Sequence, residues 1–206
     1  MAEVRTTSFG GLTIAHDERV LTPRTWTLHQ SRWALELLDG LPGGPVLELC
    51  SGAGQIGLVV AAGTTRHLVC VDVDPVAARY TQSNAVLAGV DDRVEMRVRP
   101  LQRALDADER FPLILADPPW VSREDVGRFP EDPVTAIDGG PGGGLDVARE
   151  CLRVIGEHLA ANGRALVQLG SVDQAGALAA EIDDGGLRVM EVRTFDDRGV
   201  LVLLAR

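Results

Sequence analysis

Two stretches of the sequence combine residue types that can do chemistry at a spacing that suits one reaction centre. In V-L-E-L-C-S-G-A-G-Q-I-G, residues 46–57, three glycines form a GxGxxG pattern between an expected strand and an expected helix: Gly52, Gly54 and Gly57. Glycine lets the backbone approach a ligand where a Cβ atom would block it. In I-L-A-D-P-P-W, residues 114–120, an apolar run ends in a carboxylate, a rigid turn and a flat ring.

The first stretch predicts a nucleotide site. Asp72 ends the next apolar run, at a distance that suits a carboxylate accepting hydrogen bonds from ribose hydroxyls. Glu48 lies inside the first apolar run, where an ionised carboxylate is costly unless it is paired. A cationic ligand such as S-adenosylmethionine would pair it, whereas the pyrophosphate of a dinucleotide would be repelled. An NAD-type site, and a glycine turn that only packs a helix on a strand, are the alternatives.

The second stretch has the pattern [D/N]-P-P-[aromatic], which recurs in methyltransferases that act on nitrogen conjugated to a planar group. Such a nitrogen is a poor nucleophile, because its lone pair is delocalised. Asp117 can accept a hydrogen bond from one N–H and the backbone carbonyl of Pro118 from the other, while Pro119 stiffens the turn. Trp120 offers a flat face for stacking. These four candidate catalytic residues would act by orientation; the alternative is a strand-ending turn with a packed tryptophan.

The elements that position these stretches alternate between strands and helices. Short apolar strands are expected at 45–50, 67–73, 94–99, 112–116, 163–170, 187–192 and 200–205, and helices at about 27–38, 54–62, 75–87, 145–160 and 174–183. This pattern predicts a mostly parallel, seven-stranded α/β sheet with helices on both faces. Ligands bind such sheets at the carboxyl ends of the strands, where both stretches fall. Residues 1–26 are expected as an irregular lead-in with some short structure, in F-G-G-L-T-I and then L-T-P-R-T-W-T, and 27–206 as the catalytic domain.

Composition limits the classes of function. The chain has 206 residues and a net charge of −10, which disfavours non-specific binding to nucleic acid. Three cysteines without CxxC spacing favour a cytoplasmic protein over a disulfide framework or a metal site. No apolar run is long enough to span a membrane. The glycine-rich segment 138–146 (D-G-G-P-G-G-G-L-D) suits either a flexible surface loop or a mobile lid.

Taken together, the motifs resemble class I S-adenosylmethionine-dependent methyltransferases with a Rossmann-like fold. The L-T-P-R-T-W-T segment, D-P-P-W and the I-D-G-G-P-G-G-G-L-D loop are similar to those of the protein-(glutamine-N5) methyltransferases that modify release factors. The resemblance implies a glutamine side chain held by residues 117–120 and S-adenosylmethionine as the cofactor. It implies cofactor contacts from the following residues: Glu48, Cys50, Gly52, Gly54, Asp72, Val73, Gln102 and Asp117, with Arg24 and Thr27 near the mouth.

The chain departs from the family pattern at several positions. Asp117 stands where that family usually has Asn, and Trp120 where it has Tyr. After the third strand, R-V-R-P-L-Q-R offers no carboxylate for adenine, so Gln102 or backbone groups would serve. The family's N-terminal substrate domain has no counterpart, which favours either a partner subunit at a sheet edge, a homodimer or a smaller acceptor. Adenine in RNA or DNA, a small-molecule amine, a non-catalytic cofactor-binding subunit and a dinucleotide oxidoreductase are the rival hypotheses.

Overall fold

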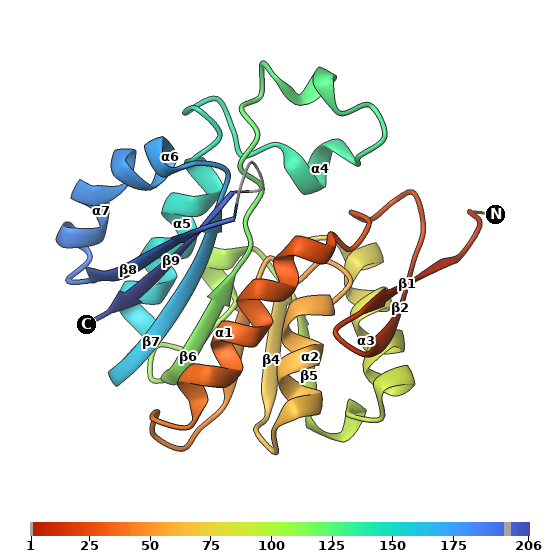
Figure 1. The fold of residues 1–206 in the computed structure, drawn as a ribbon, viewed down its shortest axis with the longest axis horizontal. Coiled ribbons are helices and arrows are strands. Elements are labelled where there is room, and N and C mark those ends of the chain that lie inside the picture. Colours follow the sequence, from red (N-terminus) through yellow and green to blue (C-terminus); the bar gives the residue numbers. More distant parts are fainter. Residues whose placement is uncertain (1, 196–198) are drawn as a thin grey trace.

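A seven-stranded sheet forms the centre of the computed structural model, which describes residues 2–195 and 199–206 (Figure 1). The strands lie in the order β5-β4-β3-β6-β7-β9-β8. Their bounds are Val46–Leu49 (β3), Leu68–Asp72 (β4), Val94–Val98 (β5), Phe111–Ala116 (β6), Leu159–Leu169 (β7), Arg188–Thr194 (β8) and Val200–Ala205 (β9). The strands from β5 to β7 pair in parallel, and β9 is antiparallel to both of its neighbours. The predicted seven-stranded, mostly parallel sheet is confirmed.

Helices cover both faces of this sheet. One face packs against α1 (Leu28–Leu38), α2 (Gln55–Gly63) and α3 (Pro75–Ala88), and the other against α5 (Asp146–His158), α6 (Val172–Ala177) and α7 (Ala179–Asp184). Successive residues of β6 from Leu113 to Ala116 alternate between the two cores, as the period of a strand requires. The helix predicted over 174–183 is instead two short helices that meet at Leu178. No helix within the described ranges could cross a membrane.

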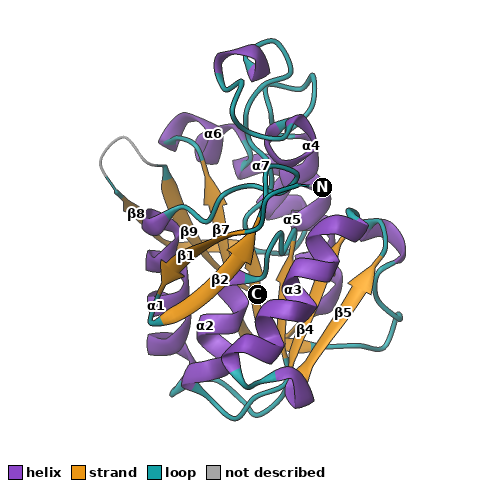
Figure 2. Ribbon diagram, turned by 90° about the vertical axis from the view of Figure 1, so that its right-hand side faces the viewer, coloured by secondary structure: helices purple, strands orange, loops and turns teal. Residues whose placement is uncertain are grey.

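The expected lead-in contains a β-hairpin of β1 (Arg5–Phe9) and β2 (Leu12–His16), which lies outside the helices in Figure 2. Asn84 of α3 fastens it, because its buried side chain accepts a hydrogen bond from Ala15 N and donates one to Ala15 O. Asp17 then accepts a hydrogen bond from Tyr80 at 2.7 Å. The hairpin contains the F-G-G-L-T-I stretch, where some short structure was expected, and the segment brings residues 19–27 to the carboxyl edge of the sheet.

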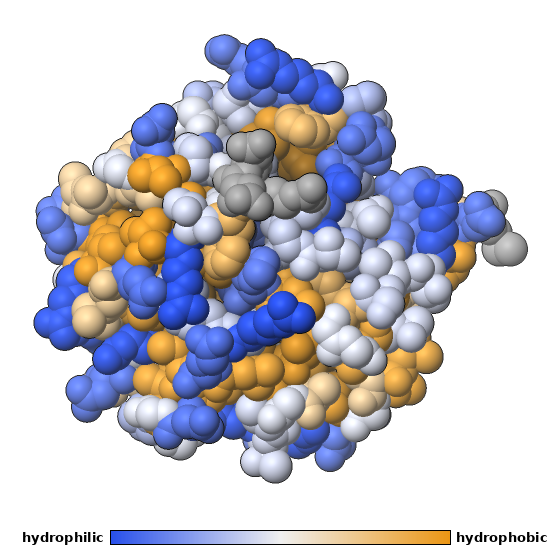
Figure 3. Space-filling view, in the orientation of Figure 1, coloured by the Kyte–Doolittle hydropathy of each residue, from blue (hydrophilic) through white to orange (hydrophobic). Residues whose placement is uncertain are grey.

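A lobe formed by residues 121–144 stands above that edge (Figures 1 and 2). It contains a 3₁₀ turn at Val126–Arg128 and the short helix α4 (Val134–Ile137), where no helix was expected from the sequence. Hydrophilic side chains cover its outermost part in Figure 3. The lobe faces the point where β3 and β6 are neighbours, and where the chain connections leave in opposite directions. This is the position at which open α/β sheets bind ligands.

Candidate functional site

Two adjoining cavities lie at the carboxyl ends of the strands. The larger has a volume of about 410 Å³ and is lined by the loops after β3, β4, β5 and β6. The smaller has a volume of about 250 Å³ and lies between the loop after β6, residues 21–27 and the lobe. Five residues line both cavities and so mark their junction: Leu21, Gln55, Asp117, Pro119 and Ala136.

The loop after β3 is a tight turn of backbone with three positive φ angles. These are +58° at Cys50, +56° at Gly52 and +82° at Gly54, which precedes α2. Asp72 at the end of β4 fixes the turn, because Gly52 N donates to its Oδ2 at 2.8 Å. Burial raises the pKa of Asp72. The sequence thus placed glycine where a left-handed conformation is needed, except at Cys50.

This loop and the larger cavity fit an adenosyl ligand. A Cβ atom added at Gly52 would meet no protein atom within 4 Å, so the loop leaves open space on its outer side. Asp72 also lines that cavity and presents a carboxylate suited to ribose hydroxyls. Of the other predicted cofactor residues, Cys50, Val73 and Gln102 line the same cavity. Gln102 Nε2 donates to Glu150 Oε2 at 2.8 Å.

Asp74 caps the following helix. Its Oδ1 accepts a hydrogen bond from Val76 N at 2.7 Å, and Pro75 occupies the first turn of α3. Gly54 has a structural role too, since a Cβ atom there would come within 3.0 Å of Thr81.

Glu48 was predicted to contact a cationic ligand, but its side chain does not reach either cavity. Its carboxyl group is buried beneath α2, where it accepts hydrogen bonds from Gly57 N at 2.9 Å and from Cys70 Sγ at 3.4 Å. It is not among the residues that line either cavity. Burial raises the pKa of Glu48 to about 8. Gly57 belongs to this contact, because a Cβ atom there would lie 2.4 Å from Glu48 Oε2.

Arg24 and Thr27 lie in the smaller cavity, beside the junction with the larger one. Arg24 donates two hydrogen bonds to Asp132 of the lobe, at 2.5 and 2.6 Å. Thr27 Oγ1 donates to Arg24 O at 2.9 Å, which holds the segment in shape. The ion pair therefore ties the lobe to the N-terminal segment over the smaller cavity.

Asp117 lies at the junction of the cavities. Since it follows the last residue of β6, its carboxyl group stands between the glycine loop and the smaller cavity. Burial alone raises the pKa of Asp117 to about 7. Pro118 and Trp120 line the smaller cavity with it, and Pro119 lines both. The structure thus brings all four predicted catalytic residues to one place.

The glycine-rich segment supports this loop from behind. Val121 N donates to Ile137 O, and Gly139 N to Val121 O at 2.8 Å. Gly144 has a φ of +78°, and a Cβ atom there would lie 2.3 Å from Trp120 O. Gln174 Nε2 also donates to Trp120 O, at 2.9 Å. The glycines of this segment therefore pack against the Asp-Pro-Pro-Trp loop. The sequence-based expectation was either a flexible surface loop or a mobile lid, and it did not include this packing.

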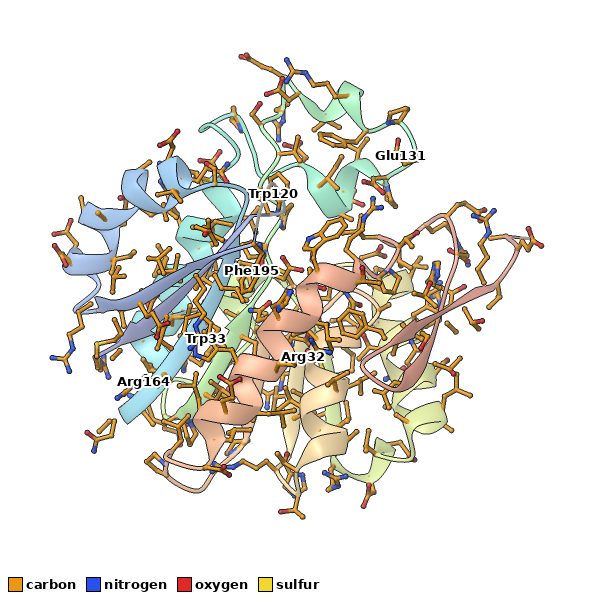
Figure 4. All side chains as sticks on the ribbon, viewed as in Figure 1. Arg32, Trp33, Trp120, Glu131, Arg164 and Phe195 are labelled. Atoms are coloured by element: carbon orange, nitrogen blue, oxygen red, sulfur yellow. The ribbon has the colours of Figure 1, made fainter. Side chains whose placement is uncertain are left out.

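Aromatic rings give the smaller cavity its apolar walls. Trp26, Trp120 and Phe129 line it, and Glu131 and Asp132 add carboxylates from the lobe. Figure 4 places Trp120 at the top of the sheet, below the part of the lobe that carries Glu131. Trp120 is fixed by close packing, because a Cβ atom on Gly170 would lie 2.4 Å from its ring. The cavity suits a planar group that carries N–H donors.

Several lining residues escaped the sequence-based prediction. Arg19 and Val20 reach the larger cavity from the lead-in, while Gln55 and Gln168 line the smaller one. The position of Gln55 inside the glycine pattern, directly after Gly54, was a usable signal. The others are far from any motif in the sequence and reach the cavities only through the fold.

Comparisons with known proteins agree with this geometry. Residues 29–129 match the family model described as methyltransferase small domain. The chain is 32% identical over 180 residues to the ribosomal protein uL3 glutamine methyltransferase of Bradyrhizobium diazoefficiens, covering 78% of this chain and 54% of that protein. It is 33% identical over 168 residues to the release factor glutamine methyltransferase of Cereibacter sphaeroides, covering 78% and 59%. The chain thus spans only 54% and 59% of the lengths of these two relatives.

Solved structures share the fold at low sequence identity. The hMettl16 catalytic domain in complex with MAT2A 3'UTR hairpin 1 superposes with a TM-score of 0.73 at 17% identity, covering 94% of this chain and 74% of that one. The ribosomal protein L11 methylase of Lactobacillus delbrueckii subsp. bulgaricus gives 0.68 at 12% identity, covering 92% and 83%. The predicted class I methyltransferase fold is confirmed.

Proposed function

Because residues 29–129 match the methyltransferase small domain model, we propose that the chain is an S-adenosylmethionine-dependent N-methyltransferase whose acceptor is a glutamine side-chain amide of a protein. The observation that carries the proposal is the junction of the two cavities at Asp117. A cavity that fits an adenosyl group and a cavity with aromatic walls meet beside a carboxyl group that can accept hydrogen bonds from nitrogen. The names of the two curated relatives support the choice of a glutamine amide.

The chain's own residues bind and orient. Cys50, Gly52, Asp72, Val73 and Gln102 would hold S-adenosylmethionine in the larger cavity. When bound, this cofactor supplies an electrophilic methyl group on a sulfonium centre.

The acceptor would be held in the smaller cavity. Asp117 accepts a hydrogen bond from one N–H of the acceptor nitrogen, and the carbonyl of Pro118 from the other. The ring of Trp120 stacks against the planar amide group of the acceptor. These contacts fix the direction of the nitrogen lone pair, and the ionised carboxylate stabilises positive charge as it grows on nitrogen.

Two alternatives keep the chemistry and change the acceptor. An adenine amino group also has two N–H donors and suits the carboxylate of Asp117, but the net charge of −10 disfavours a nucleic acid. A small-molecule amine would fit the 250 Å³ of the smaller cavity. Neither has the support of relatives at 30% identity that the glutamine amide has.

The cysteines and the edge strand β8 bear on the cellular location and the partners of the chain. The three cysteines are free thiols, which supports the prediction of a cytoplasmic protein. A partner subunit or a second copy at a sheet edge stays a prediction. The edge strand β8 exposes Val189, Met190 and Val192, which is consistent with it.

The test is transfer of labelled methyl from S-adenosylmethionine to purified release factor and to purified ribosomal protein uL3. Label in a glutamine-containing peptide of either protein supports the proposal. A parallel reaction with cell extract is digested with protease or with nuclease. Label released only by nuclease would contradict the glutamine acceptor in favour of adenine, and label in small molecules would favour an amine.

A further inference from the structure

Gln55 carries a buried oxygen that lacks a donor. It is the first residue of α2, it lines both cavities, and it is 7% exposed. Its Oε1 is shielded from solvent and receives no hydrogen bond from any group in the described part of the chain. A buried acceptor without a donor is costly, and in native proteins such a group usually has a partner. The missing donor is therefore expected from an occupant of the site.

The neighbours at the junction cannot supply this donor. Leu21, Pro119 and Ala136 have apolar side chains, and Asp117 can only accept hydrogen bonds in the ionised form that the proposed function requires. The terminal torsion of a glutamine side chain is soft, so a rotation of the amide can turn Oε1 toward the cavity. An occupant that carries N–H donors would satisfy it there.

The ammonium group of S-adenosylmethionine carries N–H donors and needs a hydrogen-bond acceptor in the site. The sequence pointed to Glu48 as the group that pairs a cationic ligand, but Glu48 lies beneath α2 and is bonded to Gly57 N and Cys70 Sγ. Asp117 is required by the acceptor nitrogen in the proposed function. Gln55 remains as a polar acceptor at the junction.

We propose that Gln55 Oε1 accepts a hydrogen bond from the α-ammonium group of bound S-adenosylmethionine, and so fixes the amino-acid end of the cofactor where the two cavities meet. This inference rests on the cofactor assigned in the proposed function. The contact anchors the end of the ligand that lies beside the sulfonium, and leaves Asp117 free to hold the acceptor.

The test is calorimetric binding to Gln55→Met, which keeps the length of the side chain and removes its polar atoms. Three ligands are titrated: S-adenosylhomocysteine, its decarboxylated analogue, which keeps the amino group, and methylthioadenosine, which lacks the whole amino-acid end. We expect the Kd of the first two to rise about tenfold, the effect of losing one hydrogen bond to a charged group, and that of the third to stay unchanged. Gln82→Met, on the exposed surface of α3, is the matched control and should change none of them.

Thermal unfolding without ligand separates this role from a structural one. Since Gln55 Oε1 has no donor among residues 2–195 and 199–206, Gln55→Met should leave Tm unchanged or raise it by a few degrees. A lower Tm, equal weakening of all three ligands, or unchanged binding of S-adenosylhomocysteine would overturn the inference. So would weakening of S-adenosylhomocysteine without weakening of its decarboxylated analogue, because the contact would then be to the carboxylate. If the wild-type protein bound no S-adenosylhomocysteine, the proposed function itself would fail.

Discussion

The glycine loop after β3 and the Asp-Pro-Pro-Trp loop after β6 lie side by side but are held in different ways. The first is shaped by its own φ angles and by one carboxylate, Asp72, about twenty residues further along the chain. The second is supported by the segment around Gly139 and Gly144 and by Gln174. The binding loop is thus nearly a local structure, whereas the loop proposed to hold the acceptor depends on a distant part of the chain.

This difference separates two kinds of specificity. A loop made mainly of backbone can bind one cofactor in many related proteins, because few side chains are involved. The acceptor side is built from the lobe and the N-terminal segment, which the Arg24–Asp132 ion pair joins. Changes at residues of these segments that line only the smaller cavity, such as Arg24 and Asp132, would therefore alter the acceptor side without disturbing the larger cavity.

The largest expected effect on activity comes from substitution of Asp117. Asp117→Ala should lower kcat/KM by about a hundred- to a thousandfold, because it removes a charge and a hydrogen-bond acceptor beside the reacting nitrogen. Labelled methyl transfer measures the loss, with Asp173→Ala, exposed on α6, as the control. Full transfer by Asp117→Ala would remove the distinction between the two loops, since the second would then have no chemical role.

The pH dependence sharpens the same test. With a pKa of about 7, Asp117 is mostly ionised only above neutral pH, so kcat/KM should rise about tenfold per unit below pH 7 and level off above it. Asp117→Asn should give a flatter profile. A rate that falls above pH 7 in the wild type would instead mean that the protonated carboxyl group donates to the amide oxygen.

A smaller effect on activity is expected from substitutions in the glycine-rich segment that supports the Asp-Pro-Pro-Trp loop. Gly143 and Gly144 have similar φ angles, +68° and +78°, but a Cβ atom has open space at the first and lies 2.3 Å from Trp120 O at the second. Gly143→Ala should therefore cost about 1 kcal/mol in unfolding free energy from backbone strain alone. Gly144→Ala should lose the same amount and, because of the clash with Trp120 O, about 1–3 kcal/mol more of unfolding free energy. It should also lower kcat/KM about tenfold or more.

Denaturant unfolding and methyl transfer on this pair measure both quantities. Equal behaviour of the two variants would show that the glycine-rich segment does not position the Asp-Pro-Pro-Trp loop. The binding of S-adenosylhomocysteine should be the same in both, since neither residue lines the larger cavity.

The smallest effect concerns stability at Glu48. Its pKa rises from 4.5 to about 8 on folding, so the folded state binds the proton more tightly and loses stability as the pH increases from 4.5 to 8. Glu48→Gln removes this loss, so its Tm should match that of the wild type near pH 5 and exceed it by a few degrees at pH 8.5. Thermal unfolding across this range is the measurement, with exposed Glu124→Gln as the control. A constant difference in Tm would mean that Glu48 does not titrate between these values.

The strands and the two loops were accessible from the sequence for local reasons. Apolar runs of five or six residues predicted β3, β4 and β6, and Pro118 predicted where β6 must end. The helix cap at Asp74 is local in the same way, because its signal, an Asp before a Pro, involves neighbours in the chain.

Errors arose where the determining contact is distant. Glu48 looked like a ligand for a cation, because the sequence does not reveal that Gly57 N, one turn into α2, meets it beneath the helix. For residues 5–16 the sequence indicated only some short structure, because Asn84, which fastens the hairpin, comes from α3. The glycine-rich segment looked flexible, because its close contacts are with Trp120.

The sequence by itself determined the class of fold, the glycine loop and the residues that end β6, because each depends on φ preferences and apolar patterns within a few residues. Only the tertiary structure decided that Glu48 is enclosed, that Gln55 lies at the junction, and that the lobe and N-terminal segment close over Asp117. The physical reason is that burial and hydrogen-bond satisfaction depend on groups brought together by the fold, and a linear pattern does not specify which groups these are.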